Sequence, residues 1–138
     1  MPDAIFLSAG IPDPKRGPTY ARTADTIAIA AAVSAVVHVT LGRRRLVWGG
    51  HPAITPMIWV VATDLGLEYA EWVTLYQSRY FADDFPEDNE RFQNIVHVDA
   101  VAGDRAKSLD AMRSRMFTES RFEAAVFIGG MEGIVDEF

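Results

Sequence analysis

The stretch AAVFIGGMEGIVDEF, residues 124–138, begins as a short apolar run, breaks at three glycines and ends as an acidic amphipathic segment. Residues 124–128 have the length and composition of a fully buried strand. The glycines permit a tight turn and a close approach to a ligand, and residues 134–138 predict a first helical turn. A glycine turn that opens a helix presents unpaired N–H groups and a positive dipole end, which suit phosphate. Many chains use the same turn as a plain strand-to-helix connection.

Length and composition restrict the class of protein. A chain of 138 residues is expected to form one domain, residues 1–138, around one sizeable core. Hydrophobic residues make up 49% and charged residues 23%, which is a globular composition and not a disordered one. The net charge of −6 argues against a general nucleic-acid-binding protein, because such proteins normally present a basic face.

The sequence contains no cysteine, which excludes disulfides, thiolate catalysis and cysteine-ligated metal centres. The histidines His38, His51 and His97 have no metal-ligand spacing, so we expect neither a metal nor a cofactor. The N-terminus lacks the basic and apolar regions of a signal peptide, and the uncharged run at residues 26–42 is short and partly polar for a membrane span. We therefore expect a cytoplasmic protein with no membrane or nucleic-acid partner.

The alternation of predicted elements indicates the fold class. Strands are predicted at residues 4–9, 46–48, 71–77, 94–99 and 124–128, and helices at 23–41 with Thr23 as its cap, 56–65 and 104–117. Residues 10–18 and the acidic residues 81–92 predict irregular loops. This order predicts a Rossmann-like three-layer α/β fold, with a parallel sheet of about five strands and helices on both faces.

The helix at residues 23–41 is apolar on nearly every side. One side of it is expected to cover the sheet, and the other needs a second apolar partner. In so small a chain, a second subunit is the natural source of that partner. The sequence therefore predicts a homo-oligomer, a dimer or larger.

A second glycine turn follows the second strand, where Thr55 can cap the next helix and Pro56 suits its first turn. In parallel α/β sheets, ligands bind outside the carboxyl ends of the strands. The residues at these ends and in the two glycine turns form the candidate ligand-binding set: Ser8, Gly49, Gly50, His51, Thr55, Gln77, Ser78, Gly129, Gly130, Met131, Glu132 and Gly133.

Arg113 belongs to the same candidate set for a different reason. It lies in the middle of the apolar stripe of the helix at residues 104–117, whereas Arg115 lies at the edge of that stripe. An arginine directed inward needs an anionic partner, or its side chain must extend to solvent. Arg113 is therefore more informative than most of the basic residues.

Five segments together resemble the SLOG superfamily, the Rossmann-like group named for the Smf/DprA and LOG proteins: IFLSAGIPDP, LVWGGHPAIT, VTLYQSRYF, SLDAMRSRM and FIGGMEGIVDEF. The resemblance covers nearly the whole chain and is closest to the third SLOG cluster, found in bacterial conflict systems. It implies binding of a nucleotide or NAD-derived small molecule by a sensor module that acts on an effector domain or protein. Family members usually continue beyond the helix that the last turn opens, so a minimal version or a truncated chain is expected.

The LOG branch of this superfamily hydrolyses the N-glycosidic bond of nucleoside 5′-monophosphates. Its pattern PGG-x-GT-x-x-E is preceded by a helix that carries M-x-x-R-K. The matching residues in this sequence are Gly129, Gly130, Gly133 and Glu137 for the first motif, and Met112 and Arg115 for the second. If the chain is an N-glycosidase, the resemblance implies Glu137 and Arg115 as its catalytic residues.

The sequence also departs from the LOG pattern. Ile128 replaces the proline, Ile134 replaces the threonine, Met116 replaces the lysine, and Met131 with Glu132 fills the space of a single residue. The extra residue shifts the N–H groups of the turn, and the missing threonine removes a phosphate contact. We therefore rank ligand sensing first, nucleotide hydrolysis second, and assembly without a ligand third.

Overall fold

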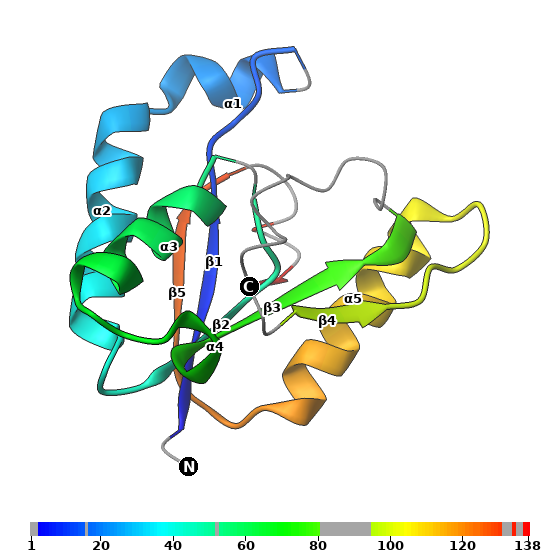
Figure 1. Ribbon diagram of the computed structural model, residues 1–138. Coiled ribbons are helices and arrows are strands. Elements are labelled where there is room, and N and C mark those ends of the chain that lie inside the picture. Colours follow the sequence, from blue (N-terminus) through cyan, green and yellow to red (C-terminus); the bar gives the residue numbers. More distant parts are fainter. Residues whose placement is uncertain (1–2, 16, 52, 81–94, 131–133, 135–136) are drawn as a thin grey trace.

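The computed structural model describes residues 3–15, 17–51, 53–80, 95–130, 134 and 137–138. Its centre is a parallel five-stranded sheet with the strand order β4-β3-β2-β1-β5 (Figure 1). The strands are β1 (Ala4–Gly10), β2 (Arg45–Trp48), β3 (Val73–Ser78), β4 (Ile95–Val98) and β5 (Phe122–Gly129). Each pair of neighbouring strands is parallel. The predicted Rossmann-like α/β sheet is therefore confirmed.

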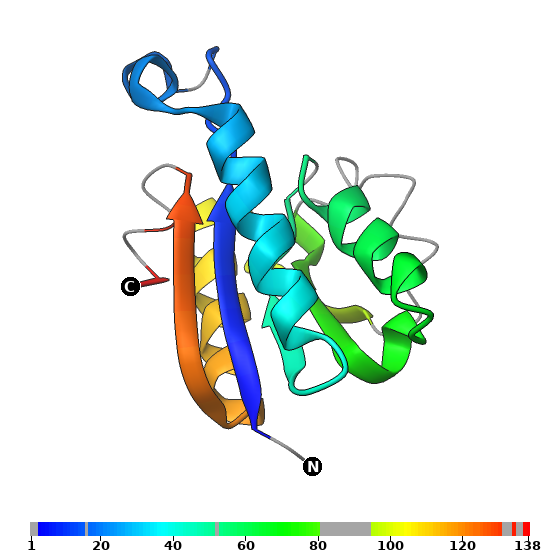
Figure 2. The same ribbon diagram turned by 90° about the vertical axis from the view of Figure 1, so that its left-hand side faces the viewer.

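Helices cover both faces of this sheet. The helices of the chain include α1 (Pro18–Thr23), which buries no residue, and α2 (Thr26–Thr40), α3 (Thr55–Asp64), α4 (Tyr69–Trp72) and α5 (Arg105–Glu119). Figure 2 shows α2 and α3 side by side on one face of the sheet, while α5 crosses the opposite face. The prediction of a three-layer arrangement is thus confirmed.

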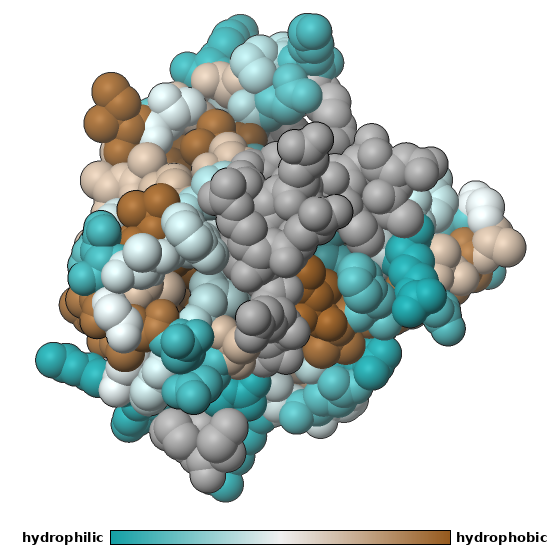
Figure 3. All heavy atoms as spheres, in the orientation of Figure 1, coloured by the Kyte–Doolittle hydropathy of each residue, from teal (hydrophilic) through white to brown (hydrophobic). Residues whose placement is uncertain are grey.

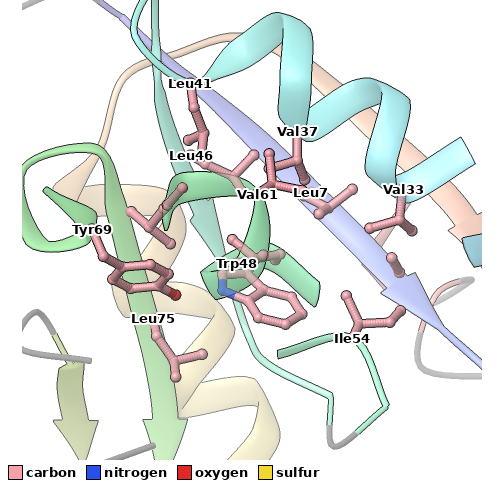
Figure 4. Packing of buried hydrophobic residues seen from close by; sticks show 14 of the residues in the cluster. Leu7, Val33, Val37, Leu41, Leu46, Trp48, Ile54, Val61, Tyr69 and Leu75 are labelled. Carbon is pink, nitrogen blue, oxygen red and sulfur yellow. The ribbon is translucent and has the colours of Figure 1, made fainter. Parts of the chain in front are cut away.

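The alternation of side chains along β1 divides the apolar core between the two faces. Leu7 points toward α2 and α3, where it meets Val33, Val37 and Trp48 (Figure 4). Phe6 points the other way and belongs to a cluster with Met112 and Met116 of α5. Phenylalanine rings extend this second cluster, with centroids 5.0–5.9 Å from that of Phe6, at Phe117, Phe122 and Phe127.

The helix predicted at residues 23–41 is α2, which begins three residues later than predicted, so the predicted cap Thr23 was wrong. α1 ends at Thr23, and α2 begins after Asp25, whose carboxylate accepts a hydrogen bond of 2.9 Å from the Ala28 N–H. An aspartate satisfies the unpaired N–H groups of a first helical turn at least as well as a threonine. Pro18, predicted to lie in an irregular loop, instead begins α1, because its fixed φ suits a first helical position.

Two strand predictions also needed correction. The third strand was predicted from Glu71, but α4 includes that residue and β3 begins at Val73. The fifth strand was predicted to be fully buried, whereas Ala124 and Ala125 of β5 are exposed. The reason is the strand order, which places β5 at an edge of the sheet with β1 as its neighbour. An apolar strand composition does not specify whether the strand is central or at an edge.

Two sequence features lie outside the described residues, namely the acidic stretch 81–92 and the turn residues Met131, Glu132 and Gly133. Within the part of the chain that the structure describes, no helix has the length and apolar character needed to cross a membrane. The same residues contain no group of three or more histidine, aspartate or glutamate side chains placed to hold a metal ion.

Candidate functional site

The carboxyl end of β1 lies at the point of the sheet where the strand order reverses. From β1 the strands proceed through β2 and β3 to β4 at one edge, and β5 then lies on the other side of β1. In open α/β sheets, this reversal leaves a crevice outside the strand ends, and ligands bind there. The ends of β1, β2 and β5 therefore define the candidate site.

Both glycine turns come together at this strand end. A Cβ atom built on Gly10 would lie 3.4 Å from the Cα atom of Gly130 and 3.3 Å from Cδ2 of His51. Gly129 pairs with Gly10 in the sheet and has a φ of +62°. A Cβ atom on Gly129 would lie 2.6 Å from the Gly10 carbonyl oxygen, so only glycine permits this approach. Gly10 itself was missing from the predicted set, although a glycine directly after an apolar strand could have marked it.

Hydrogen bonds from neighbouring elements hold the turn after β2. Gln77 of β3 donates from Nε2 to the Gly49 carbonyl at 3.3 Å, and the buried Thr55 hydroxyl donates to the His51 carbonyl at 2.9 Å. Thr55 is the first residue of α3, not its N-cap, and it binds back to the turn. Gly50 has a φ of +84°, and a Cβ atom there would meet the Gln77 amide. Gln77 and Thr55 therefore position the turn.

The imidazole of His51 lies over the end of β1. Its Nδ1 accepts a hydrogen bond of 3.2 Å from the Ala53 N–H, which assigns the proton of the neutral ring to Nε2. The Cδ2–Nε2 edge of the ring faces Gly10. The site thus has an N–H donor at the junction of the two glycine turns. Ser78, another predicted residue, is buried and accepts a hydrogen bond from the Tyr80 N–H at the end of β3.

A charged cluster lies on the α5 side of the same strand end. The Ser8 hydroxyl donates to Oε2 of Glu137, and Nε of Arg113 lies 3.4 Å from Oε1 of Glu137. The Arg113 and Glu137 side chains are 13% and 12% exposed, so this ion pair is largely removed from solvent. Asp110, which is exposed, lies 3.9 Å from the same guanidinium group. Of the two alternatives for an arginine directed inward, Arg113 thus has the anionic partner.

The structure does not bring Arg115 to Glu137. Its Nε donates to Glu119, which also accepts a hydrogen bond of 2.8 Å from the Tyr76 hydroxyl. Burial, followed by the contact with Glu119, raises the pKa of Tyr76, and the hydrogen bond from Arg115 lowers the pKa of Glu119. This second cluster was not predicted, because the pattern match selects Arg115 by spacing alone. The apolar stripe of α5, by contrast, singled out Arg113, which is the arginine that contacts Glu137.

The parallel sheet with helices on both faces defines the Rossmann-like class of α/β domains. Within that class, the model of the SLOG cluster3 family matches residues 19–138, and the chain therefore belongs to this family. Searches of curated proteins and of solved structures gave no match.

Proposed function

We propose that this SLOG cluster3 domain binds a nucleotide or an NAD-derived small molecule outside the carboxyl ends of β1, β2 and β5. In this proposal it is a sensor module of a bacterial defence system that acts on an effector domain or protein. The observation that supports the proposal most directly is the convergence of both glycine turns on Gly10, at the strand reversal where ligands bind in such sheets.

The two sides of the site are suited to different parts of such a ligand. The turn after β2 leads into α3, and the positive end of that helix dipole favours a phosphate group, while the N–H groups of residues 51 and 53–55 donate within the turn. The Nε2–H of His51 adds a neutral donor beside this turn. On the α5 side, Arg113 offers a cation to an anionic group, while Glu137 accepts hydrogen bonds from hydroxyl groups such as those of a ribose.

A second candidate function is hydrolysis of a nucleoside 5′-monophosphate at its N-glycosidic bond. The observation that favours it is the Glu137 carboxylate, which the Ser8 hydroxyl and Arg113 hold at the end of β1. A carboxylate in this position can stabilise a developing oxocarbenium ion or accept a proton from the attacking water. Arg113, and not Arg115, is the cation beside it in this structure.

The test is a thermal-shift panel of AMP, NAD, ADP-ribose and cyclic ADP-ribose isomers, with released base measured in parallel by chromatography. A ligand that binds the native state raises Tm in proportion to the logarithm of its saturation. We expect at least one compound to raise Tm for the wild type and for Glu119→Gln, the matched control. If no compound shifts Tm, the binding proposal is wrong. If Glu137→Gln abolishes base release while binding survives, the hydrolase is the correct function.

A further inference from the structure

One face of α2 is turned away from the sheet (Figure 2), and the residues exposed on it are largely apolar. Ile27 is 82% exposed and Val39 is 62% exposed, and Ala31 and Ala35 between them are also exposed. These four residues recur every fourth position and so form one stripe along the helix. The opposite face of α2 is buried in the protein through Ile29, Val33, Val37 and Thr40.

The charge distribution separates this stripe from the rest of the surface. No residue from Thr26 to Gly42 carries a formal charge, although the chain has a net charge of −6. Figure 3 shows apolar residues gathered on the side of the molecule where α2 and α3 lie. Scattered exposed apolar residues are normal, but a continuous uncharged stripe is typical of a surface that contacts another protein. Like-charged copies repel each other least across an uncharged face.

We propose that α2 packs antiparallel against α2 of a second copy of this chain, about a two-fold axis that passes between Ala31 and Ala35, at the level of residue 33 along the helix. Both subunits of such an interface use the same surface. If residue i of one subunit contacts residue j of the other, residue j of the first also contacts residue i of the second. Ile27 and Val39 lie six positions on either side of Val33, and Ala31 and Ala35 lie two positions on either side. Ile27 of each copy therefore meets Val39 of the partner subunit. The central alanines allow the helix axes to approach to about 8 Å.

Charges at the two ends of α2 favour the same orientation. Asp25 caps the N-terminus of α2 and is exposed, and Arg43 is exposed just beyond its C-terminus. Antiparallel packing places each Asp25 near Arg43 of the partner subunit and opposes the two helix dipoles. Parallel packing would instead place like charges together. The occupant of this face is therefore a second copy in antiparallel orientation.

Disulfide cross-linking tests the orientation, because the natural chain has no cysteine. The two Ile27 positions of an antiparallel pair are separated by twelve residues along the helix, about 18 Å, which exceeds the 4.4–6.8 Å that a disulfide spans between Cα atoms. We expect Ile27→Cys mixed with a tagged Val39→Cys to form a mixed disulfide dimer, and neither variant to cross-link alone. Cross-linking of Ile27→Cys alone, or no cross-linking at all, would overturn the proposal.

Sedimentation velocity of the 138-residue chain tests the interface itself. We expect a wild-type dimer, with Ala31→Glu raising its dissociation constant at least tenfold because the carboxylate enters an apolar contact. Ala106→Glu, at an exposed position of α5, is the matched control and should leave the dimer unchanged. Arg43→Glu, which lies outside α2, should weaken the dimer without affecting the helix.

A monomeric wild type, or equal dissociation constants for Ala31→Glu and Ala106→Glu, would refute the interface. Neither result depends on ligand binding at the end of β1.

Discussion

Two clusters on the α5 side of the sheet combine the same three chemical groups. In one, Glu137 contacts Arg113 of α5 and the Ser8 hydroxyl of β1. In the other, Glu119 contacts Arg115 of α5 and the Tyr76 hydroxyl of β3. The Glu137 side chain is 12% exposed, whereas that of Glu119 is 41% exposed.

This difference in exposure decides what each cluster can do. Water screens the pair of Glu119 and Arg115, so its two charges contribute little to stability or to binding. The pair of Glu137 and Arg113 lies where the effective dielectric constant is lower, at the strand end that we propose as the ligand site. Two arginines two positions apart on one helix thus acquire different roles, because burial and not residue type sets the strength of a charge interaction.

The largest expected effect is a loss in the free energy of unfolding, and it distinguishes Arg113 from Arg115. Arg113→Met leaves the Glu137 carboxylate largely buried without its cation, so we expect the free energy of unfolding to fall by about 3 kcal/mol. Arg115→Met leaves Glu119 in contact with solvent, and its effect should be much smaller. Urea denaturation of both variants at pH 7 measures the two changes. Equal losses would show that burial does not distinguish the clusters.

A smaller effect is expected from the hydroxyl groups. Ser8→Ala and Tyr76→Phe each remove one hydrogen bond to a carboxylate, so each should lower the free energy of unfolding by about 1 kcal/mol. The two variants should differ in ligand binding, because Ser8 lies in the candidate site and Tyr76 does not. We expect Ser8→Ala alone to reduce the thermal shift caused by the compound that stabilises the wild type. An equal reduction for Tyr76→Phe would contradict the assignment of the site to the β1 end.

The smallest expected effect is the pH dependence of the exposed cluster. Arg115, and then Tyr76, lower the pKa of Glu119 from its usual value of 4.5. A carboxyl group with a lowered pKa in the folded state stabilises that state above its unfolded pKa, and the contribution is lost as the pH falls through the folded pKa. The wild type should therefore lose slightly more stability than Glu119→Gln between pH 7 and pH 3. The midpoints of urea denaturation at both pH values measure the two losses of stability. Identical losses for the wild type and Glu119→Gln would refute the prediction.

Local sequence patterns determined much of the secondary structure. Apolar runs located each strand, and Pro56 and Gly66 bounded α3 to within about one residue. The periodicity of α5 also predicted that Arg113 is directed inward, where an arginine needs an anionic partner or must extend to solvent, and the structure shows the partner to be Glu137. These inferences succeed because helical and strand periods and terminal residues act over a few neighbouring positions.

Tertiary structure decided the strand order and the pairing of distant residues. The order makes β5 an edge strand, although its apolar sequence is typical of a buried one. Ser8 and Glu137 are 129 positions apart, and no local pattern relates them. Likewise, the spacing of the LOG motif selects Arg115, while the packing of α5 places Arg113 beside Glu137. The sequence thus determined which groups need partners, and the packing of the sheet and helices determined which partners they have, because those contacts form between segments that are distant along the chain.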